Sequence, residues 1–193
     1  MLIVEAFILS IIVALLRGGE LSGLARVRLR SAWLAFAPLA VQLAVFLFEP
    51  VRFQLREAIP YLHALTYVFA GAFVLANANV PGMKIMGLGA ASNALVITAN
   101  GGYMPASSAA LTGAGMIPVL QALASGPHHN SVLIDGRTVL WFLGDIFYVP
   151  PPFPTPNVFS VGDVLIAAGC FLFVQAATGK ALLGCDGRKS SAL

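Results

Sequence analysis

Hydrophobic positions gather into long, nearly uninterrupted stretches along this chain. Four stretches are strongly apolar, and a fifth is rich in Gly and Ala and carries no charge after Lys84. A helix needs roughly 20 apolar residues to cross a bilayer, and about 17 are tolerated. We therefore predict about five membrane-spanning helices, at residues 1–16, 31–48, 58–78, 83–99 and 158–178.

The composition agrees with a lipid environment. Of the 193 residues, 59% are hydrophobic and 10% are charged, and the mean hydropathy is +0.88. A soluble domain carries about 25% charged residues, because water must solvate its surface. We predict an all-α membrane protein with one transmembrane domain over residues 1–193. The sequence shows no convincing internal repeat and no separate soluble domain.

The basic residues predict how the chain is oriented. Eight of the eleven lie on one side of the predicted spans, in the segment after the first span, in the turn at Lys84 and in the C-terminal tail. Cytoplasmic segments are enriched in Lys and Arg. We therefore expect the N-terminus outside and the C-terminus inside a bacterial inner (plasma) membrane. Residues 1–16 lack a basic n-region and a small-residue cleavage site, so we interpret them as a retained helix.

Residues 100–157 would then form a single extracytoplasmic segment. This segment is too apolar for an ordinary loop, because no charged side chain occurs between Lys84 and Asp135. Residues 103–125 are expected to form a small-residue helix or a re-entrant piece that Pro118 interrupts. Residues 138–148 are apolar but too short to span, and the prolines of 150–156 predict a stiff, extended connector. The segment is therefore predicted to be partly embedded.

Two aspartates are the leading candidates for chemistry. Asp163 lies a few residues into the last span, where Ser160 is the better N-cap, so we expect Asp163 to face the protein interior. Asp145 sits between apolar residues of the outer segment. Each could equally be structural, one bonding a neighbouring helix and the other capping a turn. Two close carboxylates cannot both ionise cheaply, so as a pair they could divide general-acid and general-base roles.

Two further polar groups are candidate substrate-binding residues. Asn100, Gly101 and Gly102 close the fourth predicted span. They are typical of a helix C-terminal cap, which is the favoured interpretation, although an amide beside two glycines could also bond a substrate. Asp135 and Arg137 belong to the polar cluster of the outer segment, and pairing between them near a surface would be worth little.

The remaining polar positions indicate no metal or cofactor. His128 and His129 are adjacent, so their side chains rarely point the same way, and a solvated turn is favoured over a metal site. Glu5 and His63 lie within predicted spans and could reach toward the interface. Cys170 lies in an apolar run and Cys185 in the polar tail, which argues against a disulfide. No basic, aromatic-rich stretch indicates nucleic-acid binding.

The order of several short motifs resembles an uncharacterised family of small bacterial membrane proteins. These are Gly-Gly-Glu-Leu-Ser at 18–22, Asn-Gly-Gly-Tyr-Met-Pro at 100–105, Leu-Gly-Asp at 143–145 and Ser-Val-Gly-Asp at 160–163. The resemblance covers nearly the whole chain. It implies a polytopic membrane protein and no particular activity, because the family is a domain of unknown function.

A second, local resemblance is to lipoprotein signal peptidase. Phe-Ser-Val-Gly-Asp at 159–163 is similar to the Phe-Asn-Val-Ala-Asp run that opens the last helix of that peptidase, with Ser160 and Gly162 as departures. Leu-Gly-Asp-Ile-Phe at 143–147 is similar to its Val-Val-Asp-Phe run. The resemblance implies that Asp145 and Asp163 activate water against a membrane-embedded or lipid-linked substrate.

Three hypotheses for the function follow from the sequence. The first is an aspartyl hydrolase that acts on a lipid-linked substrate. The second is a non-catalytic subunit or scaffold of a larger membrane complex, and the third is a carrier of a small solute or lipid. The expected partners are membrane lipid and, depending on the hypothesis, such a substrate or other subunits. Broken helices and paired repeats usually announce carriers and are not evident here, so the carrier ranks third.

Overall fold

The computed structural model describes residues 2–37, 40 and 57–179. The predicted span at 31–48 lies outside these residues except for 31–37 and 40, as do Cys185 and the basic residues of the C-terminal tail.

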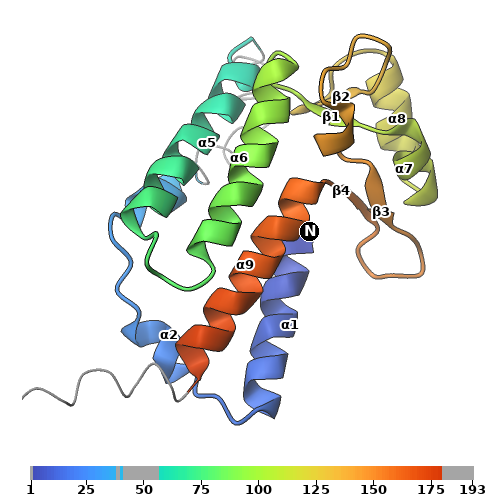
Figure 1. Ribbon diagram of the computed structural model, residues 1–193. Helices are drawn as coiled ribbons and strands as arrows, with labels where there is room; N and C mark the ends of the chain where they lie inside the picture. The colour runs from blue at the N-terminus through green and yellow to red at the C-terminus, as the bar shows by residue number, and fades with distance from the viewer. Residues whose placement is uncertain (1, 38–39, 41–56, 180–193) are drawn as a thin grey trace, which may run out of the picture.

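Four long helices make up the body of the part of the chain that the structure describes (Figure 1). They are α1 (Leu2–Leu16), α5 (Ile59–Ala76), α6 (Met83–Ala99) and α9 (Val161–Thr178), and a short helix α2 (Ser22–Arg26) follows α1. Helix α9 packs against both α1 and α6, and α5 packs on α6. The predicted helical character is confirmed, and four of the five predicted spans coincide with these helices to within a few residues.

Length and composition would allow two of the described helices to cross a membrane. These are α5 and α9, each 18 residues long, with mean hydropathies of 1.6 and 1.8. Only 11% of the α5 window and 33% of the α9 window is buried, so both helices are apolar on faces that the protein does not cover. Helices α1 and α6 are apolar but shorter, at 15 and 17 residues. A bundle of five spans is therefore not established.

Glycines allow α6 and α9 to approach each other closely. A Cβ added to Gly89 of α6 would overlap the carbonyl oxygen of Gly162 and the side chain of Ile166 in α9. Farther along α9, a Cβ on Gly169 would meet the backbone at Gly82 and the Met86 side chain. Small residues at such positions let helix backbones come into contact where lipid offers no hydrophobic driving force.

Buried polar side chains join the other helices. Ser10 of α1 is completely buried and donates a hydrogen bond to the carbonyl oxygen of Phe171 at 3.0 Å, and Gln175 donates back to the Ser10 carbonyl at 2.7 Å. After α5, the buried Asn77 side chain accepts from the backbone N–H of Arg30 at 2.8 Å and donates to its carbonyl at 2.9 Å. These bonds tie α1 to α9, and the segment after α2 to the end of α5.

The segment between α6 and α9 is compact and contains short strands that the sequence did not predict. Strand β1 (Met104–Ala106) pairs in parallel with β2 (Ser131–Leu133), and β3 (Phe147–Val149) pairs antiparallel with β4 (Asn157–Phe159). The remaining elements are α7 (Ser108–Gly113), α8 (Ile117–Ala124) and the 3-10 turn η1 (Trp141–Leu143). Thr155 also donates a hydrogen bond to Glu5 of α1.

The expectation that Pro118 interrupts a helix over residues 103–125 is wrong. Pro118 lies in the first turn of α8, where its missing N–H costs nothing, and therefore helps to begin that helix. The interruption is at Gly115, which separates α7 from α8 and adopts a φ of 71°. Glycine reaches this left-handed conformation without the steric cost that a side chain would impose.

The close contact between α6 and α9 generates a stability prediction. Gly89→Ala should lower the free energy of unfolding by about 1–3 kcal/mol, the usual cost of overpacking, because the new methyl meets backbone. Gly71→Ala in α5 is the matched control, since nothing lies within 4 Å of its added Cβ. Thermal unfolding of the detergent-solubilised variants measures both. Equal midpoints for the two variants would contradict the described contact.

Candidate functional site

A polar cavity of about 310 Å³ lies between α5, α6 and α9 and the segment that joins α6 to α9. This volume is at the lower end of the range of about 300–1,000 Å³ that is typical of small-molecule sites. Both candidate aspartates line it. The polar lining residues are His63, Tyr67, Asn93, Asn130, Ser131, Asp145, Asn157 and Asp163, and apolar side chains, among them Ile97, Met104 and Leu111, complete the wall.

Asp163 is fixed by the start of α9. Ser160 is the N-cap, as predicted, and its hydroxyl accepts from the Asp163 backbone N–H at 3.0 Å. In return, Asp163 Oδ2 accepts from the Ser160 backbone N–H at 3.0 Å, which completes a capping box. A carboxylate near a helix N-terminus is also favoured by the helix dipole. One oxygen of Asp163 is thus committed to the fold.

Asn93 connects this capping box to α6. Its side chain is buried, with 2% of its surface exposed, and its Nδ2 donates to Asp163 Oδ1 at 2.9 Å. Its Oδ1 accepts from the Ser160 hydroxyl at 2.9 Å, so both ends of the amide are occupied and its orientation is fixed. Asp163 therefore accepts one hydrogen bond on each oxygen, as an ionised carboxylate does.

Asp145 is held by its backbone and not by its side chain. Its N–H donates to the Pro105 carbonyl at 2.8 Å, and its carbonyl accepts from the Ser107 N–H at 3.0 Å, so it forms a bridge beside β1. Its side chain lines the cavity, and its Oδ1 is buried with no hydrogen-bond partner in the described part of the chain. Buried polar atoms are usually paired, so an acceptor of this kind calls for a proton or a donor.

The electrostatics of Asp145 follow from this placement. Burial, and then the charge of Asp163, raise the pKa of the Asp145 carboxyl from its usual value of 3.8 to about 7. The residue as a whole is only partly buried and lines the cavity, whereas its Oδ1 atom is shielded from solvent. The two side chains therefore differ. The Asp163 carboxyl group accepts hydrogen bonds from Asn93 and from the Ser160 N–H, whereas the Asp145 carboxyl group has no such donor among the described residues and titrates near neutral pH.

His63 contributes a fixed, neutral ring to the same cavity. Its Nδ1 lies 3.0 Å from the carbonyl oxygen of Gly102, and its Nε2 lies 3.3 Å from the amide nitrogen of Asn130. A carbonyl only accepts and an amide N–H₂ only donates, so Nδ1 carries the proton and Nε2 accepts. Sequence reasoning did not assign His63 or Asn93 to a site. The signal available was a polar residue inside an apolar span.

The structure places the other predicted site residues outside the cavity wall. Asn100 Nδ2 donates to the carbonyls of Val96 and Val139 at 2.7 and 2.8 Å, and Gly101 and Gly102 adopt φ values of 68° and 89°. This is the helix-terminus arrangement that the sequence favoured. A role of these three residues in substrate binding stays a prediction.

Asp135 and Arg137 lie on an exposed turn. Asp135 Oδ1 accepts from the Arg137 backbone N–H at 2.8 Å, and this bond is the main reason that the pKa of the Asp135 carboxyl is lowered. Neither residue lines the cavity, and their role in substrate binding also stays a prediction. Among the described residues, no group of three or more His, Cys, Asp or Glu side chains could hold a metal ion.

The arrangement can do two things chemically. The cavity carries two carboxyl groups, and no Lys or Arg occurs among the described residues that line it. A positively charged group or a hydrogen-bond donor would therefore be stabilised there, while an anion would be repelled. The Asp145 carboxyl group, with a pKa near 7, can also transfer a proton to or from a molecule bound in the cavity.

These features define a small, largely helical protein with an acidic cavity at one end of its helices. The chain belongs to a family of unknown function, DUF5317, whose model matches residues 26–175 and so includes both aspartates. It is also similar to an uncharacterized protein of Thermotoga maritima, with 25% identity over 172 residues that cover 89% of each chain. No solved structure matches.

The predicted resemblance to an uncharacterised family is confirmed by these matches. The resemblance to lipoprotein signal peptidase is not borne out by them. The structure gives a local reason for the similarity at 159–163: Ser160 and Asp163 have the spacing of a helix capping box, which recurs at helix starts in unrelated proteins.

The raised pKa of Asp145 predicts a pH-dependent stability. Between about pH 4 and pH 7 the folded state binds a proton at Asp145 that the unfolded state has released, so the free energy of unfolding should fall as the pH rises. Asp145→Asn should remove this contribution. Thermal unfolding midpoints of both proteins from pH 4 to pH 8 measure it, and curves that run parallel over this range would show the assignment to be wrong.

Proposed function

We propose that this protein crosses the membrane about five times, with its N-terminus outside and its C-terminus inside. The apolar faces of α5 and α9 support membrane insertion. Large apolar side chains are also exposed on the shorter helices, as at Leu9 in α1 and Leu88 in α6, where 54% and 62% of their surface is uncovered. Lipid would solvate these faces, and water would not.

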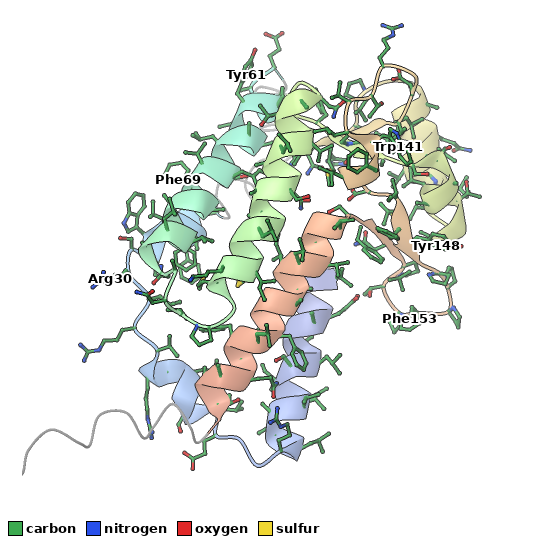
Figure 2. All side chains as sticks on the ribbon, in the orientation of Figure 1. Arg30, Tyr61, Phe69, Trp141, Tyr148 and Phe153 are labelled. Carbon is green, nitrogen blue, oxygen red and sulfur yellow. The ribbon has the colours of Figure 1, made fainter. Side chains whose placement is uncertain are left out.

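Charged and aromatic side chains support the same orientation. Arg30 lies near the end of α5 opposite to Tyr61 (Figure 2). Trp141, Tyr148 and Phe153 of the outer segment are all exposed. Exposed aromatic residues favour the boundary between lipid and water, and basic residues favour the cytoplasmic side. On this proposal, the cavity lies on the extracytoplasmic side.

The proposed topology predicts which side chains a membrane-impermeant thiol reagent can reach. In a background with Cys170 and Cys185 replaced by Ser, Arg137→Cys should be labelled in intact cells, and Arg28→Cys only after permeabilisation. Both arginines are exposed, so they form a matched pair. Labelling of Arg28→Cys but not of Arg137→Cys in intact cells would contradict the proposed orientation and support the opposite one.

We propose further that the cavity binds a small polar group that carries a primary ammonium or a similar cluster of hydrogen-bond donors. The observation that carries this proposal is the Asp145 carboxyl group: the residue lines the same cavity as Asp163, and its buried Oδ1 has no partner among the described residues. An ammonium group supplies three donors and neutralises the negative charge that two ionised carboxylates would place in a confined space.

The unlike surroundings of the two carboxyl groups favour a second candidate, which is hydrolysis of a membrane-embedded or lipid-linked substrate. Asp163, held by Asn93 and the Ser160 N–H, would accept a proton from water as the water oxygen bonds to the electrophilic atom of the substrate. Protonated Asp145 would donate its proton to the leaving group as the bond to that group breaks. This chemistry requires both carboxyl groups to reach one water molecule or the reacting atoms. It adds a reaction to the binding site without changing the residues involved.

Binding of ethanolamine as its ammonium ion tests the proposed site. Ethanolamine should raise the thermal midpoint of the purified protein more at pH 8 than at pH 6, because ionised Asp145 binds the cation better. Asp145→Asn should lose this response, and Glu57→Gln, which removes an exposed carboxylate outside the cavity, should keep it. Neutral ethylene glycol is the chemical control. An equal response of Asp145→Asn and the wild type would overturn the proposed site.

A further inference from the structure

An apolar groove adjoins the polar cavity along the same three helices. Its volume is also about 310 Å³, and it lies between α5, α6 and α9 with Leu34 and Ala35 beside them. The α5 side is formed by Thr66, Tyr67, Ala70, Phe73 and Val74, the α6 side by Met86 and Ala90, and the α9 side by Ile166. No charged side chain occurs among these residues.

The groove continues the cavity on a single face of each helix. On α5, the lining passes from His63 and Tyr67 in the cavity to Ala70 and Val74 in the groove. These steps of three or four residues keep side chains on one helix face. Tyr67 lines both hollows, so they are neighbours on either side of this residue.

The other two helices show the same succession. On α6, Ile97 and Asn93 line the cavity, and Ala90 and Met86 line the groove one or two turns away. On α9, Asp163 lines the cavity, and Ile166 lines the groove one turn farther into the helix. All three helices therefore change from polar to apolar lining in the same direction, away from the outer segment.

A lining that is polar at one end and apolar at the other complements an amphiphile, with the polar head at one end and the alkyl chain at the other. We infer that the ligand of the proposed cavity is a lipid-like molecule with a cationic, donor-bearing head and an alkyl chain, the head beside Asp145 and Asp163 and the chain in the groove past Tyr67. The inference rests on the proposed function, because it assigns the head to the same cavity. A small polar solute would occupy the cavity alone and would make no contact with the apolar groove.

Dodecylammonium provides the test, since it joins a primary ammonium head to an alkyl chain. Native mass spectrometry of the protein released from maltoside micelles counts the bound molecules. We expect one dodecylammonium per protein in the wild type, and binding at least about tenfold weaker in Ala70→Phe, in which a larger side chain fills the groove. Ala72→Phe is the matched control, because residue 72 lies on the same helix, is exposed and does not line the groove.

The thermal response to ethanolamine separates the two proposals. Ala70→Phe should keep the wild-type response, because ethanolamine needs only the cavity. Equal dodecylammonium binding by Ala70→Phe and Ala72→Phe, with the ethanolamine response intact, would overturn the amphiphile and leave the polar site standing. If the wild type neither responds to ethanolamine nor binds dodecylammonium, the proposed polar site is wrong, and the proposed amphiphile site is wrong with it.

Two further comparisons make the outcome decisive. Dodecanol has the same chain with a neutral head and should bind at least about tenfold more weakly than dodecylammonium; equal binding would contradict the charged head site. If Ala70→Phe fails to fold, Ala35→Phe replaces it with the same expected loss, because Ala35 also lines the groove.

Discussion

The contact between α6 and α9 is the constraint on which the rest of the structure depends. Gly89 and Gly162 bring the two backbones together, and at that distance the Asn93 amide reaches both Ser160 and Asp163. Each polar side-chain atom of this group has a partner, so burying the group leaves none of these atoms without a hydrogen bond. The same contact fixes the start of α9, and through β4 the end of the preceding segment.

The residues that line the proposed site therefore contribute differently to stability and to function. Asp163 and Asn93 satisfy each other and are committed to the fold before any ligand binds. Asp145 is positioned by backbone bonds to Pro105 and Ser107, which leaves its carboxyl group uncommitted. A site that binds a donor or moves a proton needs this division, because Asp163 already accepts a hydrogen bond on each oxygen whereas Asp145 Oδ1 accepts none from the described residues.

The sequence predicted the helices better than the segment between them. The spans at 58–78, 83–99 and 158–178 correspond to α5, α6 and α9, because long apolar runs bounded by Pro60, Gly82 and Ser160 specify helices locally. Strands β1 and β2 are three residues each and pair across more than twenty intervening residues, so no local pattern announces them. The sequence also predicted Asp145 and Asp163 as site residues, and the fold brings both to one cavity. It did not predict that His63 and Asn93 line the same cavity.

The sequence by itself determined that the chain is helical and apolar, where its long helices begin and end, and which carboxylates stand out in apolar surroundings, because these depend on neighbouring residues and on composition. Only the tertiary structure decided which of those polar groups are satisfied. Asp163 and Asp145 look alike in sequence, each following a glycine among apolar residues. One meets Asn93 from a helix seventy residues away and the other meets no donor among the described residues, a difference that exists only once distant segments are packed together.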